Sequence, residues 1–182
     1  MGLDQYLHST GIPQEFFIEA AKNNETFDLV LGGFYYTQDG YNRNRSYVYF
    51  RKSWPMDYLI KENAVWQSND EWLDYCYYIS PENALKIRDT CIRALRMFKP
   101  LHNLTDKEII EVDSTKLLDE IVYNYPEGSD NYSQVIKQLD YIINIDSMCF
   151  DLMWEVSSLI DTVKLISAEQ NKGNGLFYIR SY

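Results

Sequence analysis

Few residues of this 182-residue chain have the types and spacing that catalysis requires. Only His8 and His102 titrate near neutral pH without help from their surroundings, and they lie in unrelated sequence contexts. Cys91 could in principle pair with His102 as a nucleophile and its base. However, Cys91 falls on the apolar stripe of a predicted helix, whereas a reactive thiol requires an exposed electropositive position. The sequence therefore predicts no catalytic residues, and we expect a protein that is not an enzyme.

The sequence also predicts no metal site and no cofactor. Zinc requires three or four Cys, His or carboxylate ligands at short spacings, and no Cys or His has another within ten residues. The pair Gly32-Gly33 lacks the surrounding pattern of a nucleotide-binding loop, and Gly173-Asn174-Gly175 follows a predicted helix, whereas a phosphate loop precedes one. Three cysteines without a CxxC spacing indicate buried, reduced thiols.

One segment, residues 41–54, combines basic and aromatic residues. Side chains of these two kinds can contact phosphates and stack on nucleic-acid bases. In a strand, however, alternation would place Tyr49 and Arg51 on one side and Phe50 and Lys52 on the other, so the rings could instead serve the core. Both interpretations stay open. The candidate contact residues are Arg43, Arg45, Tyr49, Arg51 and Lys52.

Acidic residues are concentrated in one part of the chain. The sequence holds 17 basic and 27 acidic side chains, a net charge of −10. Residues 101–161 contain three lysines and 13 carboxylates, so this segment alone carries a net −10. A carboxylate array on helices can present a phosphate-like potential to a basic partner, and the alternative is a solvated face that maintains solubility. The candidate partner-binding residues are Glu108, Glu111, Asp119, Glu120, Asp140, Asp151, Glu155 and Asp161.

The elements that would position these residues indicate a single α+β domain over 1–182. We expect a strand-rich part at 1–80, a helical and acidic part at 81–170, and a terminal strand at 176–182. The predicted strands are 26–38 and 46–54, joined as an antiparallel hairpin, with 74–80 and 176–182 completing a small, mainly antiparallel sheet. Helices are predicted at 13–21 and 56–66, from Pro81 to before Pro100, from a capping box at Thr105, and over 131–170 as two helices or one bent helix.

The opening MGLDQYL resembles the start of small bacteriophage and prophage proteins that begin MGLDxYL, with Gly2, Leu3, Asp4, Tyr6 and Leu7 carrying the similarity. Two further pieces resemble the same group. They are Phe50-Arg51-Lys52 and the segment 74–95, in which Cys76, Tyr78, Ser80 and Glu82 lead into the helix with Leu85 and Cys91. The resemblance covers about half of the chain and brings no assigned activity with it. Small acidic proteins of mobile elements are often inhibitors of host defence, including anti-CRISPR proteins.

These observations lead to one functional hypothesis and two alternatives. We expect a phage or mobile-element accessory protein that binds a host protein with a basic groove, such as a Cas nuclease, and inhibits it stoichiometrically. The alternatives are a small nucleic-acid-processing or nucleotide-modifying enzyme that uses Arg43 to Lys52, and a structural or interaction protein. The acidic balance disfavours direct nucleic-acid binding outside that segment. No signal peptide or long apolar run is present, so we expect the host cytosol and no membrane association; the oligomeric state stays open.

Overall fold

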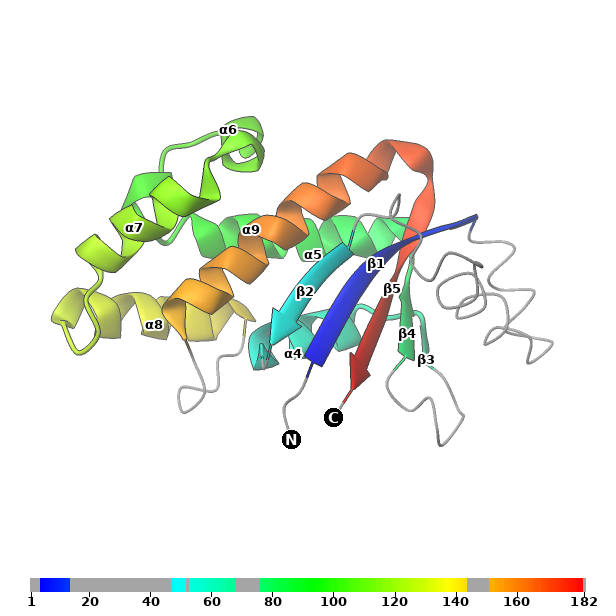
Figure 1. Ribbon diagram of the computed structural model, residues 1–182, viewed down its shortest axis with the longest axis horizontal. Helices are drawn as coiled ribbons and strands as arrows, with labels where there is room; N and C mark the ends of the chain where they lie inside the picture. Colours follow the sequence, from blue (N-terminus) through cyan, green and yellow to red (C-terminus); the bar gives the residue numbers. More distant parts are fainter. Residues whose placement is uncertain (1–3, 14–46, 52, 68–75, 144–150, 182) are drawn as a thin grey trace.

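The computed structural model describes residues 4–13, 47–51, 53–67, 76–143 and 151–181. These residues form six α-helices and one five-stranded antiparallel sheet, which confirms the predicted α+β class (Figure 1). The strands are β1 (Asp4–Pro13), β2 (Tyr47–Arg51), β3 (Trp66–Gln67), β4 (Cys76–Ile79) and β5 (Asn174–Ser181). The helices are α4 (Trp54–Glu62), α5 (Pro81–Leu95), α6 (Asp106–Glu111), α7 (Ser114–Asn124), α8 (Asp130–Ile143) and α9 (Leu152–Glu169).

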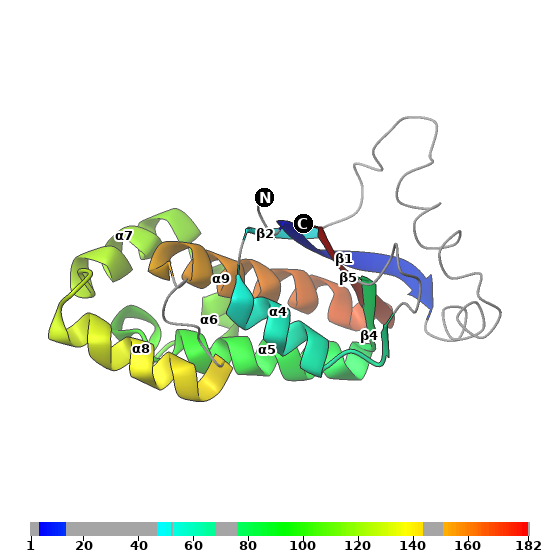
Figure 2. The ribbon, with the colours of Figure 1, turned by 90° about the horizontal axis from the view of Figure 1, so that it is seen from below.

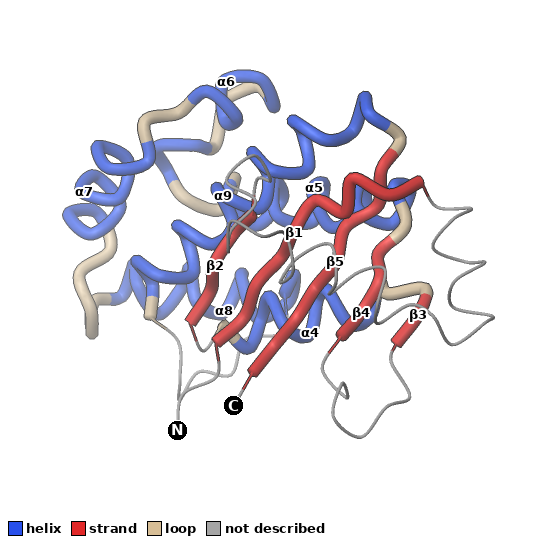
Figure 3. The backbone as a smooth tube through the Cα atoms, turned by 45° about the vertical axis from the view of Figure 1, so that its right-hand side comes forward, coloured by secondary structure: helices blue, strands red, loops and turns tan. Residues whose placement is uncertain are grey.

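The two ends of the described chain lie side by side in the sheet. Its strand order is β2-β1-β5-β4-β3, so β5 pairs with β1 on one side and with β4 on the other (Figure 3). Leu7 of β1 is in register with Val48 of β2 and with Tyr178 of β5. The prediction that the C-terminal strand completes the sheet is therefore confirmed.

Several predicted boundaries require correction. Strand β1, which is the partner of β2, is absent from the elements predicted from the sequence. The predicted strand 46–54 ends at Arg51, because Ser53 and Pro55 begin helix α4. The predicted helix 56–66 ends at Glu62, and Trp66–Gln67 is strand β3. The predicted strand 26–38 and most of the predicted helix 13–21 lie outside the described residues.

Within the described chain, helices cover one face of the sheet (Figure 2). The central helix is α9, which contacts β1 and β2 on one side and α5 on the other. Because it is enclosed in this way, α9 is buried around most of its circumference, whereas α7 and α8 each bury a single apolar stripe. Helices α6, α7 and α8 lie to one side of the sheet and form one end of the molecule (Figure 1).

Local capping signals set the first residues of helices α5, α6, α7 and α9. Ser80 accepts a hydrogen bond from the amide of Asn83 and begins α5. Thr105 begins α6 with the predicted capping box, and Asp113 accepts bonds from two α7 amides, so that α6 and α7 are separate helices. Asp151 begins α9 in the same manner, which settles the open alternative for 131–170 in favour of two helices, α8 and α9.

Candidate functional site

A buried polar cluster joins the sheet to α4. The amide nitrogen of Gln5 donates to the Ser53 carbonyl oxygen at 3.0 Å and to the Tyr178 hydroxyl at 2.8 Å, while the Ser53 N–H donates to the Gln5 amide oxygen at 2.9 Å. Tyr178 in turn donates to the Asp57 carboxylate at 2.8 Å, and Arg180 contacts the other oxygen of Asp57 at 3.0 Å. Burial, followed by the charge of Asp57, raises the pKa of Tyr178, so the phenol remains a hydrogen-bond donor.

Glu155 of α9 extends this cluster. The Ser53 hydroxyl donates to the Glu155 carboxylate at 2.5 Å and accepts the Met56 N–H at 3.4 Å. Burial raises the pKa of Glu155 to about 7, against the lowering effect of the Ser53 bond and with a further increase from the charge of Asp151. A carboxyl group that titrates near neutrality is also a common feature of active sites.

The cluster nevertheless has a structural explanation. The side chains of Gln5, Asp57 and Glu155 are all almost fully buried, and each has hydrogen-bond partners from a different element. A substrate would have to displace these bonds to reach the carboxylates. We therefore interpret the cluster as the polar joint between β1, β5, α4 and α9. The prediction that Glu155 belongs to an exposed acidic surface is wrong, because only 3% of this residue is exposed.

The acidic helical end, formed by α6, α7 and α8, carries five of the predicted surface carboxylates. Glu108, Glu111, Asp119, Glu120 and Asp140 all lie on these helices and are exposed. The other predicted surface residues lie on α9 or at its start. Asp151 is exposed as the N-cap of α9. Asp161 is exposed near the middle of that helix; partial burial of its carboxyl raises the pKa of Asp161, and the charge of Lys164 only partly opposes this rise.

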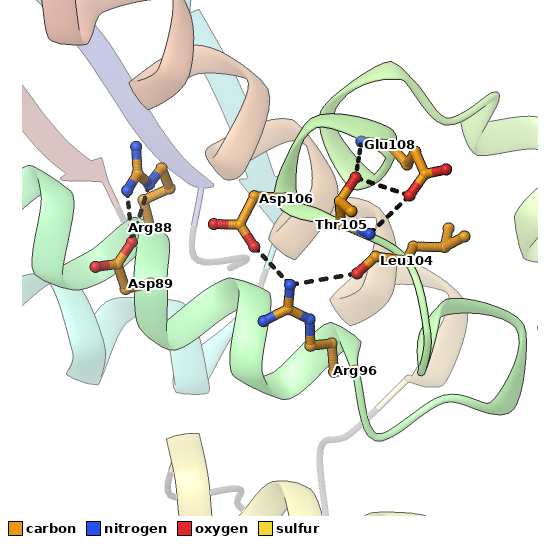
Figure 4. A network of polar contacts seen from close by, with 7 residues as sticks. All are labelled: Arg88, Asp89, Arg96, Leu104, Thr105, Asp106 and Glu108. Atoms are coloured by element: carbon orange, nitrogen blue, oxygen red, sulfur yellow. Dashed lines mark hydrogen bonds and ion pairs between the residues drawn. The ribbon is translucent and has the colours of Figure 1, made fainter.

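Two of the carboxylates in the acidic helical end stabilise local structure (Figure 4). Glu108 accepts the Thr105 N–H at 2.8 Å, and Thr105 accepts the Glu108 N–H at 3.3 Å. The Thr105 hydroxyl also donates to the Glu108 carboxylate, at 2.7 Å, and the two bonds that the carboxylate accepts from Thr105 lower the pKa of Glu108. Asp106 contacts Arg96, the C-cap of α5, at 2.6 Å, and Arg96 also donates to the Leu104 carbonyl at 3.2 Å. Thus Glu108 has a capping role that is independent of any partner.

Asp113 caps α7, but several other carboxylates of this end form no ion pair in the part of the chain that the structure describes. Within the described residues, no ion pair involves Asp119, Glu120, Glu127 or Asp130, whereas Glu111 is 3.9 Å from Lys107. Two tyrosines lie among them with unusually high exposure. Tyr123 of α7 is 85% exposed, and Tyr141 of α8 is 94% exposed. Because Tyr is a favoured anchor of protein interfaces, the combination of unpaired carboxylates and exposed rings suits a binding surface.

The predicted basic-aromatic contact is only partly described. Arg43, Arg45 and Lys52 lie outside the described residues, and for Arg51 the structure gives the backbone pairing with Asp4. Tyr49 is 40% exposed, while its neighbours Val48 and Phe50 are buried, as the predicted alternation requires.

Tyr49 belongs to an aromatic row that the sequence analysis missed. Its ring lies 5.2 Å from the ring of Tyr6, which in turn stacks on His8 at 6.0 Å between centroids. Both partners come from β1. In that segment Leu7 is the only aliphatic side chain among five residues, 5–9, so a strand pattern is hard to recognise there. The alternation of Tyr6 and His8 with Gln5, Leu7 and Ser9 was the available signal.

The pairing of Cys91 with His102 that the sequence analysis considered does not occur in the structure. Cys91 is completely buried and burial raises the pKa of its thiol, while His102 is exposed and lies against the Arg96 carbonyl. The two residues therefore do not form a nucleophile and base. No cluster of three potential metal ligands occurs in the described ranges. Among the helices that the structure describes, none has the length and apolar character needed to cross a membrane.

No protein-family model matches the chain, and comparisons with curated proteins and with solved structures give no match.

Proposed function

We propose that this protein is a mobile-element accessory protein that binds a basic macromolecular partner stoichiometrically through its acidic helical end. The partner we propose is a host-defence nuclease, with a Cas effector as the first to test, because such enzymes hold nucleic acid in a positively charged groove. The observation that carries the proposal is the set of exposed α7 carboxylates, Asp119 and Glu120, that have no ion pair in the described chain and lie beside Tyr123.

The helical position of these groups supports binding through the exposed face of α7. Lys116, Asp119, Glu120 and Tyr123 are spaced by three, one and three residues, so they share one side of the helix, opposite the buried Leu117 and Ile121. Carboxylates held on a helix are spaced by a rigid backbone, so they can replace a row of phosphates in a basic groove. Their potential would also steer the partner over distances up to the screening length, about 8 Å at physiological ionic strength.

The test compares two double charge reversals of equal size. Asp119→Lys with Glu120→Lys changes the exposed face of α7. Glu82→Lys with Asp89→Lys changes α5, where the two carboxylate side chains are 83% and 60% exposed and form surface ion pairs of little energetic value. Both variants change the net charge by +4. Glu108 is not used, because its reversal would remove the α6 cap.

We expect the α7 variant to inhibit a sensitive nuclease at least about tenfold more weakly and to lose part of the salt dependence of its on-rate, as charge steering requires. The α5 variant should inhibit like the wild-type protein. The assay is nuclease inhibition across a panel of Cas effectors and other defence nucleases, with association rates measured at several salt concentrations. Equal inhibition by both variants, or no inhibition of any nuclease at molar excess of the wild-type protein, would refute the proposal.

A further inference from the structure

A cavity that is open to solvent lies at the acidic helical end, where α7 is followed by α8 (Figure 1). It has a volume of about 310 Å³, close to the lower limit of roughly 300 Å³ for small-molecule pockets. The chain after α5, the short 3₁₀-helix η1 (Lys99–Leu101), the end of α7 and helix α8 surround it. The lining residues, all within the continuous described range 76–143, are Met97, Lys99, Asn124, Tyr125, Asn131, Gln134, Val135 and Gln138.

Carboxamide side chains make up half of this lining. Asn131, Gln134 and Gln138 are spaced by three and four residues, so they share one face of α8. In the part of the chain that the structure describes, the side chains of Gln134 and Gln138 form no hydrogen bond. The Asn124 side chain donates to the Glu120 carbonyl at 2.7 Å, which leaves its own oxygen as an acceptor. Because a carboxamide has both N–H donors and an acceptor oxygen, this wall can bind groups that donate and accept.

One cation lies among these amides in the described lining. Lys99 is exposed and forms no ion pair with any residue that the structure describes. The eight lining residues include no carboxylate, although the helical end around them is strongly acidic. The Tyr125 hydroxyl accepts the Lys99 backbone N–H at 2.9 Å, so its own hydrogen is left to donate to a ligand.

We propose that this cavity binds a small, hydroxyl-rich molecule that carries a single carboxylate, such as a sugar acid. Each hydroxyl of such a ligand both donates and accepts, which matches the carboxamides of Gln134 and Gln138. Its carboxylate would accept a charge-assisted hydrogen bond from the Lys99 ammonium. The inference goes beyond the proposed function and does not depend on it, because no carboxylate of the acidic surface takes part.

The same residues disfavour two other kinds of ligand. A nucleobase requires ring faces on which to stack, and Tyr125 provides the one ring of the described lining, where it packs edge-on against Phe98 at 5.5 Å between centroids. A phosphate ester brings a second negative charge. Glu127 and Asp130, which are exposed in the chain between Tyr125 and Asn131, would repel that additional charge.

The test uses NMR titrations of the full chain at constant pH and ionic strength, followed by amide chemical shifts. The probes are glucuronate, its neutral amide glucuronamide, acetate, which has the charge without the hydroxyls, and a glucose monophosphate. Glucuronate should bind with a dissociation constant on the order of 1 mM, and its shifts should concentrate at 97–99, 124–125 and 131–138. Each of the other three probes should bind at least about fivefold more weakly.

Matched variants separate the charge from the hydroxyl contacts. Lys99→Met should weaken glucuronate at least about fivefold and leave glucuronamide unchanged, since it removes the cation that pairs with the carboxylate. Gln134→Met should weaken both ligands by about threefold to tenfold, because both have the hydroxyls. Lys137→Met is the control, since it removes an exposed α8 lysine outside the lining. This control should change binding by less than about twofold, as a screened, distant charge would.

Equal losses in Lys99→Met and Lys137→Met would overturn the assignment, because they would show that only the net charge matters. Glucuronamide or acetate binding as well as glucuronate, tighter binding of the phosphate ester, or no saturable shifts with any probe would also overturn it. These outcomes are separable from those of the nuclease assay. The titrations do not involve the α7 charge reversal, and nuclease inhibition does not involve Lys99 or Gln134.

Discussion

Replacing Glu155 with glutamine should make the stability of this protein less dependent on pH. Glu155 is buried beside Ser53, and its pKa is raised from 4.5 to about 7 in the folded protein. Between these two values the folded state keeps a proton that the unfolded chain has released. The free energy of unfolding must therefore fall as the pH rises through this window. Below pH 4.5 both states are protonated, and above pH 7 the full penalty is present.

The size of the effect follows from the two pKa values. A change of one pKa unit corresponds to about 1.36 kcal/mol, so the shift from 4.5 to about 7 costs the folded state about 3 kcal/mol once the carboxyl is ionised in both states. Glutamine has nearly the same shape as the protonated carboxyl and can still accept the Ser53 hydroxyl. Relative to the wild-type protein, Glu155→Gln should thus gain about 3 kcal/mol between pH 4.5 and pH 8.

The assay is urea denaturation of both proteins at half-unit steps from pH 4.5 to pH 8.5. The quantity of interest is how their difference in unfolding free energy changes with pH, because this removes the other titrating groups and any constant effect of the substitution. Glu120→Gln, on the exposed face of α7, is the matched control. A difference for Glu155→Gln that is constant across the range, or that favours the wild-type protein at high pH, would show that burial does not control this carboxyl.

The hydrogen-bond partner provides a second measurement. The Ser53 hydroxyl bonds to the ionised carboxylate and so opposes the effect of burial. In Ser53→Ala the pKa of Glu155 should therefore increase further, which carbon NMR of the Glu155 carboxyl can measure even though the variant also loses its α4 cap. An unchanged or lower pKa in this variant would contradict the assigned role of Ser53.

Two further substitutions test the packing of the sheet. Gly175→Ala should destabilise the protein by about 1 to 3 kcal/mol in urea denaturation. A Cβ at this position would meet the Tyr78 side chain and lie 2.6 Å from the Ile79 carbonyl oxygen. An unfolding free energy equal to that of the wild-type protein would refute this close approach. Tyr178→Phe should cost about 1 to 3 kcal/mol, since the buried Asp57 carboxylate loses its hydroxyl donor, and a neutral effect would mean that this bond does not stabilise the joint.

The helices were predictable because their signals are local. The caps at Ser80, Thr105 and Asp113 act within three residues of their own position, so the sequence contains both the donor and the acceptor. Strand β1 has no comparable signal. Its inward residues include Gln5 and Ser9, which look like surface residues until their partners are known. Gln5 bonds to Ser53 and Tyr178, and Ser9 donates to Glu169 at 2.8 Å, all of them distant in sequence.

The same distinction explains which surface carboxylates were placed correctly. Helix α7 is amphipathic and buries Leu117 and Ile121, which are four residues apart. Asp119 and Glu120 lie between them in the sequence and fall on the other side of the helix, so the helical period alone indicates that they are exposed. Helix α9 lies between the sheet and α5, so periodicity does not separate its faces. The burial of Glu155 depends on Ser53, which is 102 positions away, and no pattern within α9 reveals that contact.

The structure therefore sorts the acidic residues by what each already does. Asp57 and Glu155 hold α4 and α9 to the sheet, and their burial makes them inaccessible to a partner. Glu108 completes the capping box of α6 with Thr105, so reversing its charge would alter α6 before it altered any interface. Asp119 and Glu120 form no ion pair in the described chain, yet they add to the repulsion among the negative charges of the acidic helical end. A basic partner that bound this face would relieve the repulsion without disrupting any bond that the carboxylates make within the protein. Helix α7 is therefore the element on which the binding hypothesis depends.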